Sequence, residues 1–289
     1  MLSSRSIPTS IRRQVRQNSG FCCVICGELP CEYEHIIPWS ECREHDVSNI
    51  TLLCPNHHAE VTAGRLSKEV VREHQREPFA FTSGRASYAF RHAKVDTIRL
   101  GGVSVKVQPD LLLHIFYSSG SSLFNVRIED NIPIYNAELH GFDSGNLIIE
   151  ENTILSSPDM WDFEQAGKGL TAFAEKDFKI LDLTLKDSVL IVNVAKIFAD
   201  GRAVVIGEHS IEVFYSTKEE SNSMNGVVLE GDFKEIAAYT DGSFEGDSIF
   251  SCCVNGRLSA EEAKAILRKV QPNPQLPFDP LGYPKFWQT

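Results

Sequence analysis

Residues 23–58 read CVICGELPCEYEHIIPWSECREHDVSNITLLCPNHH, and this stretch holds most of the chain's metal-binding side chains. Two pairs with the spacing of metal ligands bracket it, Cys23-x2-Cys26 at the start and Cys54-x2-His57 at the end. Such pairs can supply three thiolates and one imidazole to a tetrahedral zinc ion. Four ligands of this kind leave no open position, so the predicted zinc is structural.

The zinc ion is expected to hold this small, polar segment together, because metal binding contributes roughly 10–16 kcal/mol in small zinc peptides. Two alternatives stay open at this point. Cys22 is a rival to Cys23, although its spacing to Cys26 is less typical. The adjacent His57 and His58 also allow a swapped assignment with His58 on zinc, although the spacing favours His57.

A second set of residues in the same stretch has harder ligand atoms. Glu34 and His35 lie in a short β-like segment, residues 32–38 (EYEHIIP), and Asn49 and His58 follow downstream. A carboxylate and an imidazole suit an open site for a divalent cation and a phosphate.

At these residues the chain resembles the HNH endonucleases of the ββα-metal type. The family pattern is CxxC, then (D/E)HIxP, then NLxxLCxxCH, and the resemblance covers residues 10–69. It is carried by Cys23-x2-Cys26, by residues 34–38 (EHIIP) and by residues 48–58 (SNITLLCPNHH). The chain departs from the family at His57, where cysteine is usual, and at Glu34, where aspartate is usual.

The resemblance implies a role for each residue of the second set. His35 is the general base that takes a proton from the attacking water. Glu34 and His58 hold one divalent ion, Mg²⁺ or another, and Asn49 fixes the loop and orients the His35 imidazole through an amide hydrogen bond. The implied reaction is hydrolysis of DNA phosphodiester bonds. The alternative is a zinc-dependent DNA-binding regulator without catalysis.

The rest of the chain predicts an α+β protein in which an all-β domain follows the zinc-stabilised one. We expect domain limits at 1–80 for the nuclease-like domain, 81–95 for a linker, 96–257 for the β-rich domain and 258–289 for a helix and proline-rich tail. The short apolar runs after residue 96 are typical of a sandwich, a barrel or a solenoid, and the sandwich and the solenoid are favoured. Residues 137–154 and 195–213 share a weak internal echo that equally fits two ordinary hairpins.

Three helix starts are marked by their sequences. Residues 8–10 (PTS) are expected to cap a helix that stops at Gly20, and Ser67 and Ser259 are expected to cap helices that follow them.

Charge divides the chain in two. Residues 1–95 contain 12 basic and 10 acidic side chains, whereas the remainder contains 16 basic and 29 acidic ones. The acidic part does not steer the protein toward DNA. The early arginines, Arg5, Arg12, Arg13 and Arg16, form either an arm that contacts phosphates or a solvated helix face.

The β-rich part contains no catalytic cluster. It is predicted to be a sensor, a specificity module, an oligomerisation platform or a lid, and exposed strand edges favour a homo-oligomer. Restriction and phage defence are the settings that the resemblance implies. No apolar run approaches the ~20 residues that cross a bilayer, and the first ten residues lack the apolar core of a secretory signal. We therefore expect no membrane partner and a cytoplasmic location.

Overall fold

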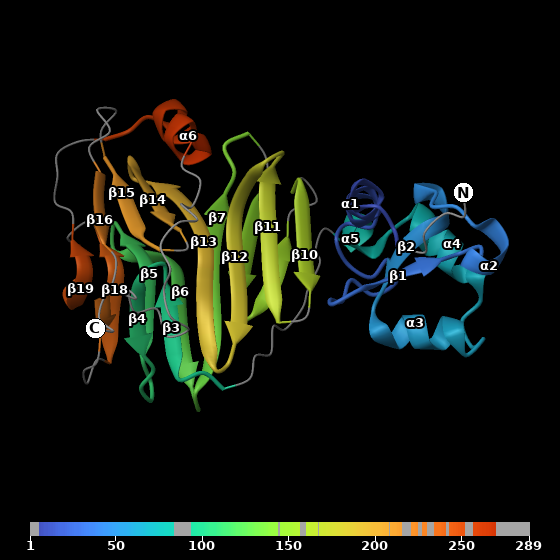
Figure 1. The fold of residues 1–289 in the computed structure, drawn as a ribbon, viewed down its shortest axis with the longest axis horizontal. Helices are drawn as coiled ribbons and strands as arrows, with labels where there is room; N and C mark the ends of the chain where they lie inside the picture. The colour runs from blue at the N-terminus through green and yellow to red at the C-terminus, as the bar shows by residue number, and fades with distance from the viewer. Residues whose placement is uncertain are drawn as a thin grey trace, which may run out of the picture.

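The computed structural model of the protein describes residues 6–83, 94–143, 145–156, 160–166, 168–207, 209–215, 221–224, 227–229, 234–240, 243–251 and 257–269. Most of the expected linker and the proline-rich tail, together with Arg5, lie outside these residues. Within them the chain is an α+β protein, as expected, with a small helical part and a large β part (Figure 1). None of the helices in these ranges is long and apolar enough to cross a membrane.

The small part, which we call the N-terminal unit, spans residues 9–83. Its elements are α1 (Thr9–Asn18), β1 (Glu32–His35), α2 (Trp39–Cys42), the 3₁₀ helix η1 (Val47–Asn49), β2 (Ile50–Leu53), α3 (Pro55–Thr62), α4 (Lys68–Arg76) and α5 (Phe79–Ser83). Strands β1 and β2 pair antiparallel, with Glu34 opposite Thr51 and His35 opposite Ile50. Helix α3 follows β2 directly, which gives the strand–strand–helix order that the sequence predicts.

The caps of the N-terminal unit follow the sequence in part. Ser67 caps α4 as predicted, because its hydroxyl accepts a hydrogen bond from the backbone N–H of Val70. Helix α1 begins after Pro8 without a side-chain cap, so the predicted cap at residues 8–10 is wrong. Proline supplies a suitable backbone conformation there but has no side-chain acceptor.

The large part, which we call the β sandwich, consists of two sheets that lie face to face (Figure 1). One sheet contains β3 (Thr97–Leu100), β4 (Val103–Lys106), β10 (Asp162–Ala166), β11 (Gly169–Glu175), β12 (Phe178–Lys186), β13 (Val189–Ala199), β14 (Arg202–Ile206), β15 (Ile211–Phe214), β16 (Ser221–Met224) and β17 (Val227–Leu229). The other contains β5 (Leu112–Ser118), β6 (Ser121–Glu129), β7 (Ile132–His140), β8 (Asn146–Glu150), β9 (Thr153–Ser156), β18 (Glu235–Thr240) and β19 (Asp247–Ser251).

The interior of the β sandwich explains why these strands form two layers. Residues alternate between buried and partly exposed along strands such as β6 and β11, so each sheet has one apolar face. The two apolar faces share one buried cluster, which includes Phe124 of β6 and Leu183 of β12. Of the two predicted architectures, the sandwich is therefore the one that the chain adopts.

The internal echo corresponds to two meanders rather than to stacked repeats. Strands β7, β8 and β9 form one antiparallel meander, and β13, β14 and β15 form another in the opposite sheet. A helix, α6 (Ala260–Lys269), packs beside β13 and β14. Ser259 caps it as predicted, because the Ser259 hydroxyl accepts from the N–H of Glu262 and the Glu262 carboxylate accepts from the N–H of Ser259.

The N-terminal unit contacts the β sandwich at the edge strand β10 (Figure 1). The guanidinium of Arg16 donates two hydrogen bonds to the carboxylate of Asp162, of 2.8 and 2.6 Å. It also donates to the hydroxyl of Tyr33 at 2.6 Å and lies 3.3 Å from the carboxylate of Glu164. Only 6% of Arg16 is exposed, so α1 is fixed on β10 by a buried bidentate ion pair.

Two further contacts involve Trp161, directly before β10. The side chain of Gln17 donates to its carbonyl oxygen at 2.6 Å, and the guanidinium of Arg13 lies 5.1 Å from the centre of its ring. For Arg16 both expectations, a phosphate-contacting arm and a solvated helix face, are wrong, because its charge is paired and its side chain is buried. Arg13 is engaged as well.

Candidate nuclease and metal site

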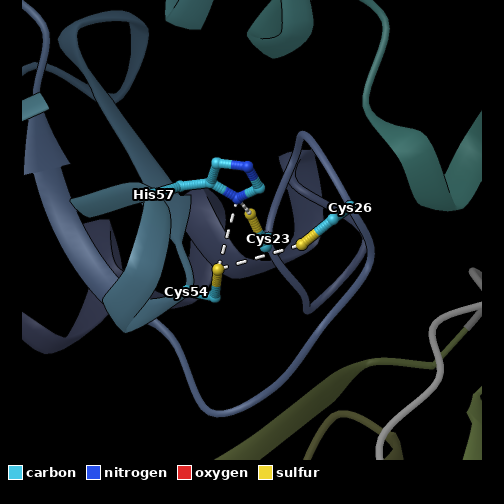
Figure 2. A group of neighbouring side chains, drawn as sticks. All are labelled: Cys23, Cys26, Cys54 and His57. Carbon is cyan, nitrogen blue, oxygen red and sulfur yellow. Dashed lines mark hydrogen bonds between the residues drawn. The ribbon is translucent and has the colours of Figure 1, made fainter. Parts of the chain in front are cut away.

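The two predicted pairs of zinc ligands come together in the structure (Figure 2). Cys23 and Cys26 lie in the turn between α1 and β1, Cys54 precedes α3, and His57 lies in the first turn of α3. Their four ligand atoms all lie within 4.8 Å of one another. Cys22 and His58 are not members of this group, so the geometry favours Cys23 over Cys22 and His57 over His58 as zinc ligands.

The turn of the first pair depends on Gly27. Its φ is +75°, and its N–H donates to the carbonyl oxygen of Cys23 at 2.9 Å. A Cβ at this position would lie 2.4 Å from the ring of Phe79, so a larger residue fits neither the backbone nor the space. This tight turn brings the Cys26 thiol toward Cys54.

The spacing of these atoms suits a tetrahedral ion. A zinc ion with bonds of about 2.3 Å to sulfur separates two ligand sulfurs by about 3.8 Å. The sulfurs of Cys26 and Cys54 are 3.8 Å apart. The Nδ1 atom of His57 lies 3.4 Å from the sulfur of Cys23 and 3.3 Å from that of Cys54. The donor set and its spacing therefore fit zinc.

The protonation of these thiols depends on whether a cation is bound. Burial raises the pKa of Cys26 and Cys54, and a backbone hydrogen bond at each thiol only partly offsets this rise. Both thiols are therefore protonated at neutral pH when no ion is bound. A bound zinc ion reverses this, because it takes thiolates as ligands and displaces their protons.

The predicted ligands of the divalent ion are also neighbours. The Nε2 atom of His58, on α3, lies 3.0 Å from the Oε2 atom of Glu34, on β1. Bonds of about 2.1 Å to an octahedral ion place two adjacent ligand atoms about 3.0 Å apart. This carboxylate–imidazole pair therefore has the spacing of two neighbouring ligands of one cation.

Lys68 and Glu32 adjoin this pair. The ammonium of Lys68, at the start of α4, forms an ion pair with the Oε1 atom of Glu34 and donates to the carbonyl oxygen of His35 at 2.7 Å. The Oε2 atom of Glu32 lies 2.9 Å from the Nδ1 atom of His58. The carboxylate of Glu34 therefore directs one oxygen to Lys68 and the other to His58.

Asn49 binds the backbone of the loop after β1. Its amide oxygen accepts from the backbone N–H of Ile37 at 2.7 Å, and its amide nitrogen donates to the carbonyl oxygen of Ile37 at 3.0 Å and to the sulfur of Cys42. These bonds fix the loop after β1, as expected. The expected hydrogen bond from Asn49 to the imidazole of His35 stays a prediction.

The imidazole of His35 lies in an aromatic cluster. Its ring centre is 5.8 Å from that of Trp39 and 5.6 Å from that of His45, and the last two rings stack at 4.4 Å. Successive side chains of a strand leave on opposite faces. The side chain of His35 therefore leaves β1 on the face opposite to Glu34.

Three neighbours of the predicted residues were missed in the sequence. The position of Glu32 could have been predicted, because residues two apart on a strand share a face, and this places Glu32 beside Glu34. Lys68 and His45 had no such signal, because neither is a position of the family pattern, and helix α4 and the loop before η1 bring them to His35 only in the fold. Only the folded chain shows these contacts.

Comparison with known proteins agrees with this geometry. The profile of the HNH endonuclease family matches residues 23–67, which include both sets of ligands. The chain belongs to the HNH endonuclease family through this N-terminal region.

A curated relative is the protein named Anaredoxin from Nostoc sp. (strain PCC 7120 / SAG 25.82 / UTEX 2576). It is 30% identical over 63 residues, which are 21% of this chain and 83% of that protein. No solved structure matches the chain. The match to the family profile lies in the N-terminal region, and the β sandwich is described by its own geometry.

Proposed function

We propose that the protein is an endonuclease that hydrolyses DNA phosphodiester bonds with one divalent ion, Mg²⁺ or Mn²⁺, and that its Cys3His group holds a structural zinc ion. The observation that carries this proposal is the 3.0 Å contact between Glu34 and His58, in a region that matches the HNH endonuclease family. When bound there, the cation supplies charge stabilisation to the phosphate and to the leaving oxygen.

The positions of His35 and Glu34 suit an in-line displacement. In such a reaction the attacking water and the leaving oxygen lie on opposite sides of the phosphorus. His35 and Glu34 are the last two residues of β1 and leave it on opposite faces. In the proposed arrangement, a phosphate bound at this end of the strand would have the imidazole on the side of the water and Glu34 and His58 on the side of the leaving oxygen.

In the proposed mechanism, His35 accepts a proton from the attacking water, because an unprotonated imidazole is available near neutral pH. Trp39 and His45 hold its ring. Asn49 acts at a distance by fixing the loop that contains this aromatic cluster.

A second candidate function is a zinc-dependent DNA-binding regulator without catalysis. The observation that favours it is the ion pair of Lys68 with Glu34, which already gives this carboxylate a cationic partner. Both the endonuclease and the regulator need a zinc ion in the Cys3His group. They differ in whether Glu34 and His58 bind a second metal ion.

A plasmid-nicking assay separates the two candidates. The full chain, loaded with zinc, is incubated with supercoiled DNA in EDTA, Mg²⁺ or Mn²⁺. The endonuclease produces open-circular DNA only with a divalent ion. Retarded mobility of the plasmid without nicking in any of the metals would support the regulator instead.

For the biological setting we propose cytoplasmic restriction or phage defence, with the β sandwich as a sensor, specificity or oligomerisation module. The setting follows from the resemblance to the HNH endonucleases. What supports a role for the β sandwich as a module is the buried contact between α1 and β10, through which an event on the sandwich can reach the N-terminal unit.

A further inference from the structure

Glu32 lies on the same side of β1 as Glu34, and both carboxylates contact the same imidazole. Residues 32 and 34 are two apart on the strand, and helix α3 packs beside β1. The Nδ1 atom of His58 is 2.9 Å from Glu32, and its Nε2 atom is 3.0 Å from Glu34. The imidazole therefore lies between two carboxylates, one at each ring nitrogen.

The two contacts cannot have the same purpose if His58 binds a cation. A metal takes the lone pair of one ring nitrogen, and the other nitrogen keeps its hydrogen. Histidine ligands usually donate that remaining N–H to a carboxylate or carbonyl group, which fixes the ring orientation and makes the ligand more basic. Nε2 faces Glu34, whose side chain is 10% exposed, whereas Nδ1 faces Glu32, whose side chain is 52% exposed.

Lys68 shows which oxygen of Glu34 is available. Its ammonium is paired with Oε1 of Glu34, so Oε2, the oxygen that faces His58, is left for a metal. The ammonium also binds the carbonyl oxygen of His35. Lys68 thus holds the Glu34 carboxylate from one side of the pair, in the same way that Glu32 holds the imidazole from the other.

We propose that Glu32 is a positioning residue, which accepts the Nδ1–H of His58 and so reserves Nε2 for the divalent cation shared with Glu34. This proposal rests on the proposed endonuclease function, and it assigns a role to a residue outside the catalytic pattern. In this role Glu32 acts through His58, the residue that its carboxylate contacts.

Two variants of Glu32 test the proposal in the full, zinc-loaded chain. Glu32→Ala removes both the charge and the acceptor, whereas Glu32→Gln keeps an acceptor for the Nδ1–H. Glu60→Ala is the matched control, because Glu60 is an exposed carboxylate on the same helix as His58. Mn²⁺ affinity is measured by calorimetry without DNA, and the tautomer of His58 is measured from its ring ¹⁵N shifts.

We expect Glu32→Ala to bind Mn²⁺ about 10–100-fold more weakly, the usual effect of losing such a partner. Glu32→Gln is expected to retain the Nδ1–H tautomer and to lose less affinity, and Glu60→Ala to match the wild type. In nicking assays the loss should appear as a higher Mn²⁺ requirement, with the rate at saturating Mn²⁺ changing less.

Three outcomes would overturn the proposal: no Mn²⁺ binding by the wild type, equal Mn²⁺ affinity and His58 tautomer in Glu32→Ala, or equal losses in the two Glu32 variants. The last result would reduce Glu32 to a surface charge. If the wild type binds Mn²⁺ but fails to nick DNA, the endonuclease is refuted. Weaker Mn²⁺ binding by Glu32→Ala than by that wild type would still support the positioning role.

Discussion

Among single residues, the cysteines of the N-terminal unit matter most for its stability. The buried cluster around them is small and consists of Cys23, Val24, Ile36, Leu53, Cys54, Val61 and Val71. Cores of this size rarely hold a domain together without a metal or a disulfide. The Cys3His group therefore stabilises the hairpin and helix that position Glu34 and His58.

This dependence predicts the effect of Cys26→Ser. Loss of one thiolate should abolish stoichiometric zinc binding and remove backbone-amide protection from β2 and α3, while strands such as β12 and β13 remain protected. Zinc analysis and hydrogen exchange measure the two effects. Cys42→Ser is the control, because Cys42 lies outside the Cys3His group and serine still offers an acceptor to Asn49. Full protection of β2 in a zinc-free Cys26→Ser protein would contradict this role.

At the same scale, the sequence predicted ligand sets better than it predicted their partners. Spacings such as Cys23-x2-Cys26 are local, so a tight turn brings the ligands together whatever the rest of the fold. The target of the Asn49 amide could not be predicted in this way. The loop from Ile37 to Asn49 determines whether that amide faces the backbone or the imidazole of His35.

Among the elements, α6 shows how a charge is buried beneath a helix. Lys196 of β13 donates to the carbonyl oxygen of Leu267 at 2.5 Å, and its ammonium lies 5.1 Å from the centre of the Phe178 ring. Burial, together with the nearby charge of Lys179, lowers the pKa of Lys196 to about 8. The folded state therefore disfavours the charged form.

This burial predicts a pH dependence of the stability of the β sandwich. Below pH 8, Lys196 is protonated in both the folded and the unfolded state, and its burial destabilises the fold. Between pH 8 and its ordinary pKa near 10.5, the unfolded chain binds more protons, so stability rises with pH. The shift corresponds to about 3 kcal/mol at most.

The measurement is urea unfolding of the wild type and of Lys196→Met from pH 7 to pH 10. The difference in unfolding free energy, wild type minus variant, should rise toward high pH. A difference that is constant across this range would contradict the burial of a charged ammonium.

At the scale of the whole molecule, the N-terminal unit covers one edge of the β sandwich. An uncovered edge strand invites pairing with another chain. Helix α1 lies against the edge strand β10, and Phe21, Cys22, Leu29 and Ala80 join the buried cluster of the sandwich. This edge therefore needs no second copy, and the expected homo-oligomer stays a prediction for other surfaces.

The ion pairs of Arg16 with Asp162 and Glu164 are also predicted to weaken DNA binding, because they withhold Arg16 from phosphates. In Asp162→Ala/Glu164→Ala, Arg16 loses both carboxylates and becomes available to phosphates. We expect tighter DNA binding, with a slope of log affinity against log salt that is steeper by about 1, the value for one added phosphate contact. The measurement is DNA affinity at several salt concentrations.

The matched control is Glu245→Ala/Asp247→Ala, which removes two exposed carboxylates near β19, at the opposite end of the molecule (Figure 1). Equal salt slopes in both double variants would show that the effect is one of overall charge and not of Arg16.

The sequence could not predict this arrangement. Arg16 and Asp162 are 146 positions apart, and β18 pairs with β5 across more than 100 residues. Apolar alternation marks each strand, but it does not say which strands pair or which edge receives α1. Local spacing predicted the ligands and the α+β class, whereas these long-range contacts follow from burial in the complete fold.

The most direct test of the endonuclease is the nicking activity of His35→Ala, with zinc content measured in the same preparations. If His35 is the general base, the variant should keep its full zinc content and its DNA affinity while the nicking rate falls by about 10²–10⁴-fold. Nicking by a zinc-replete His35→Ala protein at the wild-type rate would contradict the account.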